Sequence, residues 1–391
     1  MKTLTTYCIL YTTIANVEAF AHFAKLLKSD NGYLLSQDQD VFEWYESLKI
    51  RRGGDSILDL PLGRGLLNGV LQSLTGALHY VDIPTPQPFG LKKIPGDDSA
   101  HQFCKPGNTD VRGMCPTLNT LANHGYISRD GITTFAEVAN ACWTAFGLGY
   151  DVSAILSAFG LSAGGDLLSG KYSIGGQDNR VPNTLDVHWG NNANFLIDRW
   201  NGYNALAQKY GSFNFDQNVK DASNAYDRSR AYNPSFLAGF FWFFVSHVER
   251  VFVFALLPNG TDSVPDYKNV APFFLNKTFP PNWYRRSTPW TAPQNFPTAF
   301  EMYLVAPKKL GANVGVGNFV PLGVNITQKS PEDITCLIVI NYLDLVPAQL
   351  QQPAFAQNQD LFRGFLKGMV WPFFVNDGHY NCPVAEFTGP S

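Results

Sequence analysis

The stretch 110-DVRGMCPTLNTLANHGYISRDG-131 carries the strongest local structural signals in the chain. Pro116 suits the first position of a helix, because its ring fixes φ and it lacks an N–H that would have no partner there. Apolar residues then recur at helical spacing, and Gly125 is a typical helix stop. The stretch therefore predicts a helix over 116–124 with Cys115 as its N-cap.

A sulfur at a helix N-terminus faces unpaired backbone N–H groups and the positive end of the helix dipole, and both favour thiolate over thiol. Such an anion suits a nucleophile or a metal ligand. A nucleophile would need a histidine base, and His124, nine residues on, is too far along the helix. Zinc would need further ligands, yet no C-x-x-C or H-x-x-x-H is present. A single thiolate suffices for haem iron, and a plain buried cysteine remains the alternative.

The composition is that of a globular protein with a large core. Of 391 residues, 45% are hydrophobic and 16% are charged, which excludes a disordered chain. The formal net charge of −3 gives no basic surface for nucleic acid. The 30 Phe and 17 Tyr residues fill a large core or line a pocket for an aromatic ligand.

The N-terminus is typical of a secretory signal peptide over residues 1–21, ending in the small-x-small site Ala19-Phe20-Ala21. The alternative is an N-terminal helix of a cytosolic protein. Three N-glycosylation sequons begin at Asn259, Asn276 and Asn325. We therefore expect a secreted, N-glycosylated protein.

Cysteine usage supports a free thiol. Removal of the signal would discard Cys8 and leave five cysteines, and an odd number leaves at least one outside an intramolecular disulfide. We predict a disulfide between Cys336 and Cys382 that ties down the C-terminal tail. Cys115 is the predicted unpaired thiol.

The segment 101–135 resembles the proximal motif of fungal haem-thiolate peroxidases, the chloroperoxidase and unspecific peroxygenase family. Their pattern is roughly P-G-x-x-D-x-R-G-P-C-P-x-L-N-x-L-A-N-H-G-Y-L-x-R-x-G, and the chain follows it from Pro106 to Gly131. Met114 stands where the family has the first proline of Pro-Cys-Pro. The resemblance implies haem b, with Cys115 as the axial ligand of its iron and Pro116 and Asn119 in the cofactor-binding segment.

The segment 233–260 is similar to the part of the family that carries the distal acid, and it aligns Glu249 with that acid. The resemblance implies that Glu249 moves a proton between the two oxygens of peroxide, while the thiolate pushes electron density toward the iron. The surrounding stretch 240–257 is apolar almost all round, which predicts a buried helix. The alternative is that Glu249 is an ordinary helix residue in a salt bridge with Arg250.

The distal side departs from the family pattern. Trp242 stands where long peroxygenases have an arginine, seven residues before the acid, and no Glu occurs between Glu137 and Glu249. His247 and His188 are the candidate catalytic assistants, and for each of them a structural role is the alternative. If neither assists, Glu249 works without a charged partner.

The same departure affects the magnesium ion that the family holds beside a haem propionate. Its usual glutamate ligand is missing, so the magnesium site is in doubt. Asp178 and Asp186 are the candidate replacements.

The predicted fold class is mainly α. We expect a single helical haem-thiolate peroxidase domain over 100–391 with long loops, preceded by an N-terminal extension or pro-segment over 22–99 that includes a Pro/Gly-rich linker. Helical periodicity covers 116–124, 133–164, 190–208, 216–230 and 236–257, and the clearest strand-like run is 336–343.

The predicted function is peroxide-dependent oxidation or oxygenation of an organic substrate. The family's members serve either as broad extracellular oxidants or in a dedicated step of fungal secondary metabolism, and the unusual distal side favours the second role. The aromatic stretch 240–244 is mostly expected in the core, but if part of it lines the channel over the haem it would suit a flat aromatic or polyketide-like substrate. Halide oxidation is a further, weaker option. The alternative is a degenerate secreted protein that binds haem or an apolar ligand without turnover. We expect a monomer that binds hydrogen peroxide and a small organic molecule, but neither nucleic acid nor a membrane.

Overall fold

The computed structural model describes residues 90–166, 170–175, 178, 180, 195–234 and 236–321. Several sequence predictions lie outside these residues. They are the signal peptide, most of the N-terminal extension, His188, Asp186, the sequon at Asn325, the strand 336–343 and the disulfide between Cys336 and Cys382.

The described part of the chain is mainly helical, as the sequence predicted. Its eight α-helices are α4 (Pro116–Asn123), α5 (Phe135–Ala141), α6 (Tyr150–Gly164), α7 (Ile197–Tyr210), α8 (Phe215–Tyr232), α9 (Phe240–Leu256), α10 (Tyr267–Leu275) and α11 (Ala292–Val305). A 3₁₀ turn, η3, spans Ser99–His101, and a π-helical turn, η4, spans Cys142–Phe146.

Eight short strands in the same residues form three small antiparallel sheets. These sheets pair β1 (Lys92–Lys93) with β6 (Tyr284–Arg285), β4 (Lys171–Ser173) with both β2 (Ile132–Thr134) and β3 (Gly165–Asp166), and β7 (Gly311–Asn313) with both β5 (Leu237–Ala238) and β8 (Phe319–Pro321). Strand β1 and the buried Ile94 lie in the Pro/Gly-rich linker that the sequence predicted within the N-terminal extension over 22–99. This part of the predicted linker therefore packs against the domain.

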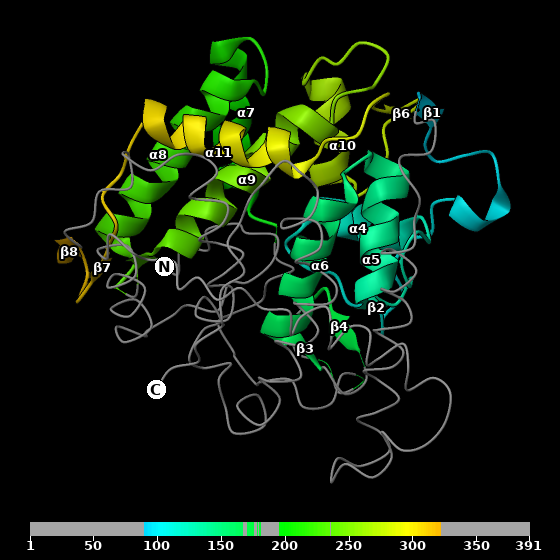
Figure 1. Cartoon of the computed structure of the whole chain (residues 1–391), viewed down its shortest axis with the longest axis horizontal. Coiled ribbons are helices and arrows are strands. Elements are labelled where there is room, and N and C mark those ends of the chain that lie inside the picture. Colours follow the sequence, from blue (N-terminus) through cyan, green and yellow to red (C-terminus); the bar gives the residue numbers. More distant parts are fainter. Residues whose placement is uncertain are drawn as a thin grey trace, which may run out of the picture.

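The helices form two neighbouring groups (Figure 1). Helices α4, α5 and α6 lie together beside the sheet of β2, β3 and β4. Helices α7, α8, α9 and α11 lie together on the other side, with α9 packed against both α8 and α11. Helix α10 packs against α4, and the buried Asp151 of α6 accepts the N–H of Ala292 at the start of α11.

An aromatic cluster fills the core where α10 and the loop after it meet the π-helical turn. Phe146, Phe273, Phe279 and Trp283 contact one another with ring centroids 5.3–5.8 Å apart, and all four are buried. Such edge-to-face and tilted pairs add to the stabilisation from area burial alone. None of the helices that the structure describes is long and apolar enough to cross a bilayer.

The stretch 133–164, where the sequence shows helical periodicity, is mostly helical but does not form a single helix. This stretch begins with β2, forms α5 and η4, breaks, and resumes as α6. Gly147 ends the π-helical turn at φ 71°, and Gly149 is the N-cap of α6. A left-handed residue cannot continue a helix, so these glycines divide the apolar run into separate elements.

Two further helix boundaries differ from the prediction. Helix α9 starts at Phe240 rather than 236, because Leu237–Ala238 pair with β7 instead. Helix α7 begins at Ile197, and 190–194 lie outside the described residues. Helix α8 contains the whole predicted stretch 216–230.

Candidate active site

Cys115 occupies the N-cap position of α4, as the sequence predicted, with Pro116 at the first helical position. Its thiol is buried and forms no disulfide, and it makes no side-chain capping hydrogen bond to the helix. The Sγ lies 3.1 Å from the hydroxyl oxygen of Thr117. The sulfur therefore sits at the positive end of a helix, next to a group that can donate a hydrogen bond to a thiolate.

Asn119 fixes the loop that carries the cysteine. Its Oδ1 accepts the backbone N–H of Gly113 at 2.9 Å, and its Nδ2 donates to the Gly113 carbonyl at 2.7 Å. The side chain is buried, so both backbone groups of Gly113 would lack partners without it. Asn119 thus positions the cysteine loop from within the first turns of α4.

The segment after β4 packs directly on this loop. The backbone N–H of Ile174 donates to the carbonyl of Gly131, and a Cβ at Gly113 would overlap the Ile174 carbonyl. A Cβ at Gly175 would likewise meet Val111 and Arg112. The cysteine loop is therefore enclosed between α4 and the end of β4, at a distance that only glycine allows.

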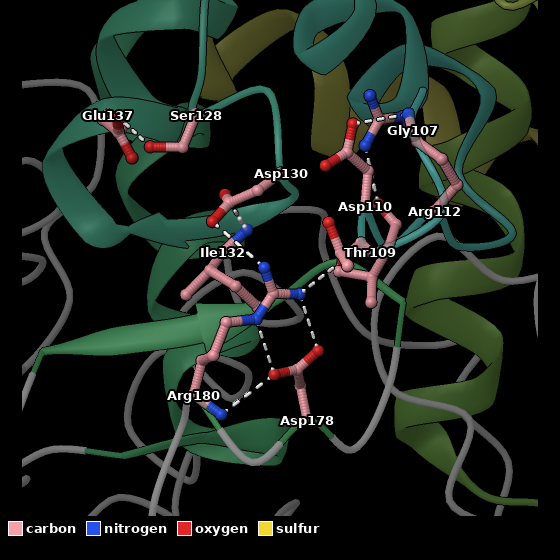
Figure 2. Close-up of polar contacts among 11 residues, drawn as sticks. Gly107, Thr109, Asp110, Arg112, Ser128, Asp130, Ile132, Glu137, Asp178 and Arg180 are labelled. Atoms are coloured by element: carbon pink, nitrogen blue, oxygen red, sulfur yellow. Dashed lines mark hydrogen bonds and ion pairs between the residues drawn. The ribbon is translucent and has the colours of Figure 1, made fainter. Parts of the chain in front are cut away.

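Arg180 lies at the surface beside the cysteine loop and contacts residues from several segments (Figure 2). Its guanidinium contacts both carboxylate oxygens of Asp178 at 2.8 Å, Asp130 at 3.2 Å and the carbonyl of Thr109 at 3.0 Å. The arginine thereby ties the chain beyond β4 to two loops that flank the cysteine segment.

Asp178 does not fit the role of a magnesium ligand. Both of its oxygens are engaged by Arg180, and these hydrogen bonds hold the pKa of the Asp178 carboxyl below its usual value. No group of three or more potential ligand side chains occurs among the residues that the structure describes. Asp186 lies outside those residues, so we derive no step through magnesium.

His124 holds the end of α4 in place. Its Nδ1 lies 2.9 Å from the carbonyl of His101, and its Nε2 lies 2.9 Å from the hydroxyl of Thr278. Burial lowers the pKa of this imidazole, which favours its neutral form. These contacts agree with the sequence argument that His124 is not a base for Cys115.

The other described cysteines, Cys104 and Cys142, are also outside any disulfide. Cys142 opens the π-helical turn, where burial raises the pKa of its thiol to about 12 and the nearby Cys115 adds to the shift. Cys142 is therefore a neutral thiol at physiological pH, beside a cysteine whose position favours the anion.

Glu249 lies on α9 with a side-chain exposure of 15%, and its Oε1 is 3.3 Å from Nη1 of Arg250. Arg250 also contacts Asp221 of α8 and Ser246 of α9. The salt bridge that the sequence argument kept as an alternative is therefore present. The sequence argument held that Glu249 would work without a charged partner if neither histidine assists, but Arg250 lies beside it as a cationic neighbour.

His247, the other candidate on α9, contacts helix α11. It is buried, and its ring lies edge-on to Tyr303 of α11 with centroids 6.1 Å apart. Two residues on a regular helix are about 200° apart, so His247 is directed toward α11 while Glu249 lies beside Arg250 and the α8 side. The described contacts of these two candidates are with different neighbours, Tyr303 for His247 and Arg250 for Glu249.

The proximal residues fit a haem iron ligated by one thiolate. The structure offers a buried sulfur outside any disulfide at a helix N-terminus, in a loop that Asn119 holds by two hydrogen bonds. The described residues contain no cluster of three or more potential metal ligands. Haem needs only this single strong protein ligand.

Comparison with known proteins agrees with this chemistry. The family described as "Peroxidase, family 2" matches residues 101–288, which include Cys115 and Glu249. An aromatic peroxygenase from Coprinellus radians is 26% identical over 232 residues, which are 52% of this chain and 88% of that protein.

Two further relatives match smaller shares of their own length. The aromatic peroxidase fscJ from Fusarium equiseti is 28% identical over 239 residues, 48% of this chain and 55% of that protein. The dothistromin biosynthesis peroxidase dotB from Dothistroma septosporum is 43% identical over 76 residues, 19% of this chain and 18% of that protein. These matches support the assignment of the chain to the fungal haem-thiolate peroxidases, a family of peroxidase and peroxygenase oxidoreductases that act on peroxide.

Proposed function

We propose that this protein is a haem-thiolate peroxidase or peroxygenase that uses hydrogen peroxide to oxidise or oxygenate an organic substrate. The observation that carries the proposal is the position of Cys115, a buried thiol outside any disulfide at the N-cap of α4. Cys115 would hold the iron of haem b through its thiolate, and Glu249 would act as the acid–base group.

The proximal residues have two tasks in this function. The N-terminus of α4 and the Thr117 hydroxyl stabilise the anionic sulfur of Cys115. Asn119, through its two hydrogen bonds to Gly113, keeps the cysteine loop in one conformation. When bound, haem supplies the redox chemistry and a coordination position for peroxide.

Glu249 handles the proton on the opposite side. With haem bound, Glu249 would accept the proton from one oxygen of peroxide as a carboxylate and return it to the other oxygen as a carboxylic acid. The O–O bond would then break with release of water, and the haem would supply the two electrons that the remaining oxygen atom needs. A carboxylate that is largely shielded from solvent suits this exchange, because its proton is not lost to bulk water.

The substrate class is part of the proposal. Two relatives are named as an aromatic peroxygenase and an aromatic peroxidase, and a third acts in dothistromin biosynthesis. These names support a flat aromatic or polyketide-like substrate and a role in secondary metabolism. Turnover of a panel of such compounds, with product analysis by mass spectrometry, distinguishes oxygenation, one-electron oxidation and halogenation.

The first test is the absorption spectrum of the reduced, CO-treated protein, measured for wild type and Cys115→Ala. We expect a Soret band at the red-shifted position of a thiolate ligand, lost in Cys115→Ala. Cys142→Ala and Cys104→Ala are matched controls that remove a neighbouring and an exposed free thiol, and both should keep the band. A wild-type protein that binds no haem when haem is supplied would refute the proposal.

Turnover separates an enzyme from a degenerate ligand-binding relative. Glu249→Gln should lower the rate of reaction with peroxide by roughly 10²–10⁴-fold, the usual contribution of a general acid–base group. Glu301→Gln, an exposed carboxylate on α11, is the control and should react like wild type. Haem binding without peroxide turnover in the wild type would favour the non-enzymatic alternative.

We also propose that the protein is secreted, N-glycosylated and monomeric. Asn276 lies exposed at the end of α10, which supports a glycan at this sequon. A mass loss on enzymatic deglycosylation of the secreted protein, abolished or reduced in Asn276→Gln, would support it. An unchanged mass in the wild type would contradict it.

A further inference from the structure

Arg250 is held by residues from two helices. Its Nε and Nη2 donate to Oδ2 of Asp221 on α8, at 3.1 and 2.8 Å. Its Nη1 donates to the carbonyl and the hydroxyl of Ser246, one turn earlier on α9, at 2.6 and 2.9 Å. Because these contacts fix both ends of a buried guanidinium, the cation has little freedom to turn away from Glu249.

The two carboxylates contact Arg250 unequally. The contact with Asp221 has the length of a strong charge-assisted hydrogen bond, whereas the contact with Glu249 is longer, at 3.3 Å. Asp221 therefore neutralises much of the positive charge of Arg250. The electrostatic stabilisation of the Glu249 carboxylate by Arg250 is correspondingly weaker. A carboxylate that must gain and lose a proton in each cycle benefits from such a weaker pairing, because a strong bidentate pair would oppose its protonation.

Two other titratable side chains of the described residues lie on helices that pack near this cluster, Tyr203 and His247. The Tyr203 phenol of α7 donates to Asn218 of α8, and burial, with Asp221 as the next cause, raises its pKa, so it stays neutral. On the opposite side of α9, His247 contacts Tyr303 of α11. Among the described residues, Asp221 of α8 and Arg250 of α9 are charged side chains that lie in this cluster with Glu249.

We infer that Arg250, shared between Asp221 and Glu249 and anchored on Ser246, is a positioning residue that sets the pH range over which Glu249 accepts the peroxide proton. This inference rests on the proposed role of Glu249. The cationic partner of Glu249 is then Arg250, the next residue in the sequence, although i and i+1 side chains do not normally face each other on a helix. Through Asp221, helix α8 also becomes part of the distal site.

The inference predicts pH shifts of opposite sign from two variants. Arg250→Gln removes the cation and leaves Asp221 near Glu249, so the acid limb of the rate of reaction with peroxide should move to higher pH by about one unit or more. Asp221→Asn removes the competing anion, so the acid limb should move to lower pH. A residue that only pins α8 to α9 would change stability in both variants without opposite pH shifts.

The test uses the haem-loaded protein and two measurements. One is the pH profile of the rate of reaction with peroxide by stopped flow. The other is the pH at which the infrared band of the protonated Glu249 carboxyl appears, assigned by its loss in Glu249→Gln. The infrared measurement does not depend on activity. If Arg250→Gln does not fold because Asp221 is left without its partner, the Asp221→Asn/Arg250→Gln double variant is measured in its place.

Asp227→Asn is the matched control, because it breaks the surface pair with Lys308 on the same helix α8. It should leave both measurements unchanged. Opposite shifts in the Arg250 and Asp221 variants support the inference, and unchanged profiles in both overturn it while leaving the role of Glu249 intact. A Glu249→Gln variant that reacts with peroxide like wild type instead overturns the proposed function.

Discussion

The backbone carbonyl of Ile174 lies directly against the α-carbon of Gly113, two residues before Cys115. A methyl group at Gly113 would overlap this oxygen, which belongs to the backbone at the end of β4 and cannot rotate away. The position of the cysteine loop thus depends on a close backbone contact between two segments distant in the sequence.

Gly113→Ala should therefore displace the cysteine loop. We expect the free energy of unfolding to fall by about 2 kcal/mol, the usual cost of overpacking, and haem affinity to fall with it. Gly202→Ala is the control, because Gly202 lies in α7 with open space around it and alanine favours helix by up to about 1 kcal/mol. Thermal unfolding and haem titration of both variants check this, and equal stability of the two would contradict it.

Asn119→Ala should destabilise the same loop by removing hydrogen bonds. It leaves the buried N–H and carbonyl of Gly113 without their partner, which costs about 3 kcal/mol in total. Asn224→Ala, on the exposed face of α8, should change stability by less than about 0.5 kcal/mol. Chemical denaturation tests the difference, and haem titration shows whether the cysteine loop depends on it.

His124 should make stability depend on pH. Burial lowers the pKa of its folded form below the usual value of 6.5 for histidine, so the unfolded chain binds the proton more readily than the folded one. The stabilisation is present above about pH 6.5 and is lost as pH falls through the folded pKa, by at most about 1.4 kcal/mol per pH unit. His124→Gln should weaken this dependence in urea denaturation between pH 7.5 and about 5. A slope identical to wild type would contradict the prediction.

The free cysteines should differ in reactivity toward alkylating reagents. Cys104 is exposed, whereas Cys142 is held as a neutral thiol by a pKa raised to about 12, and thiolate is the reactive form. In native protein at pH 7–8, iodoacetamide should modify Cys104 well before Cys142, as read by peptide mass spectrometry. In urea both should react at similar rates, which controls for intrinsic differences.

Several structural features could be predicted from the sequence because their causes are local. The N-cap Cys115, Pro116 at the first helical position and the stop near Gly125 act within a turn or two of each other. The structure confirms each of them. The family motif added the roles of Cys115 and Glu249, which stay predictions until the variants are measured.

Other elements escaped prediction because a competing local signal hid them. Helices α10 and α11 contain Pro272 and Pro297, which usually interrupt a helical pattern. The apolar run 133–164 shows the opposite effect. Its helical periodicity is continuous, but two glycines divide it into separate helices. Periodicity alone does not show where a left-handed residue ends a helix.

The sequence by itself determined that the chain is mainly helical, that Cys115 caps a helix, and which family it belongs to, because these depend on residue types at short spacing. Only the tertiary structure decided which groups surround the two candidate catalytic residues. Ile174 reaches Gly113 from the end of β4, and Asp221 reaches Arg250 from α8. Such contacts follow from how helices and strands pack in space, and no local pattern of residues specifies them.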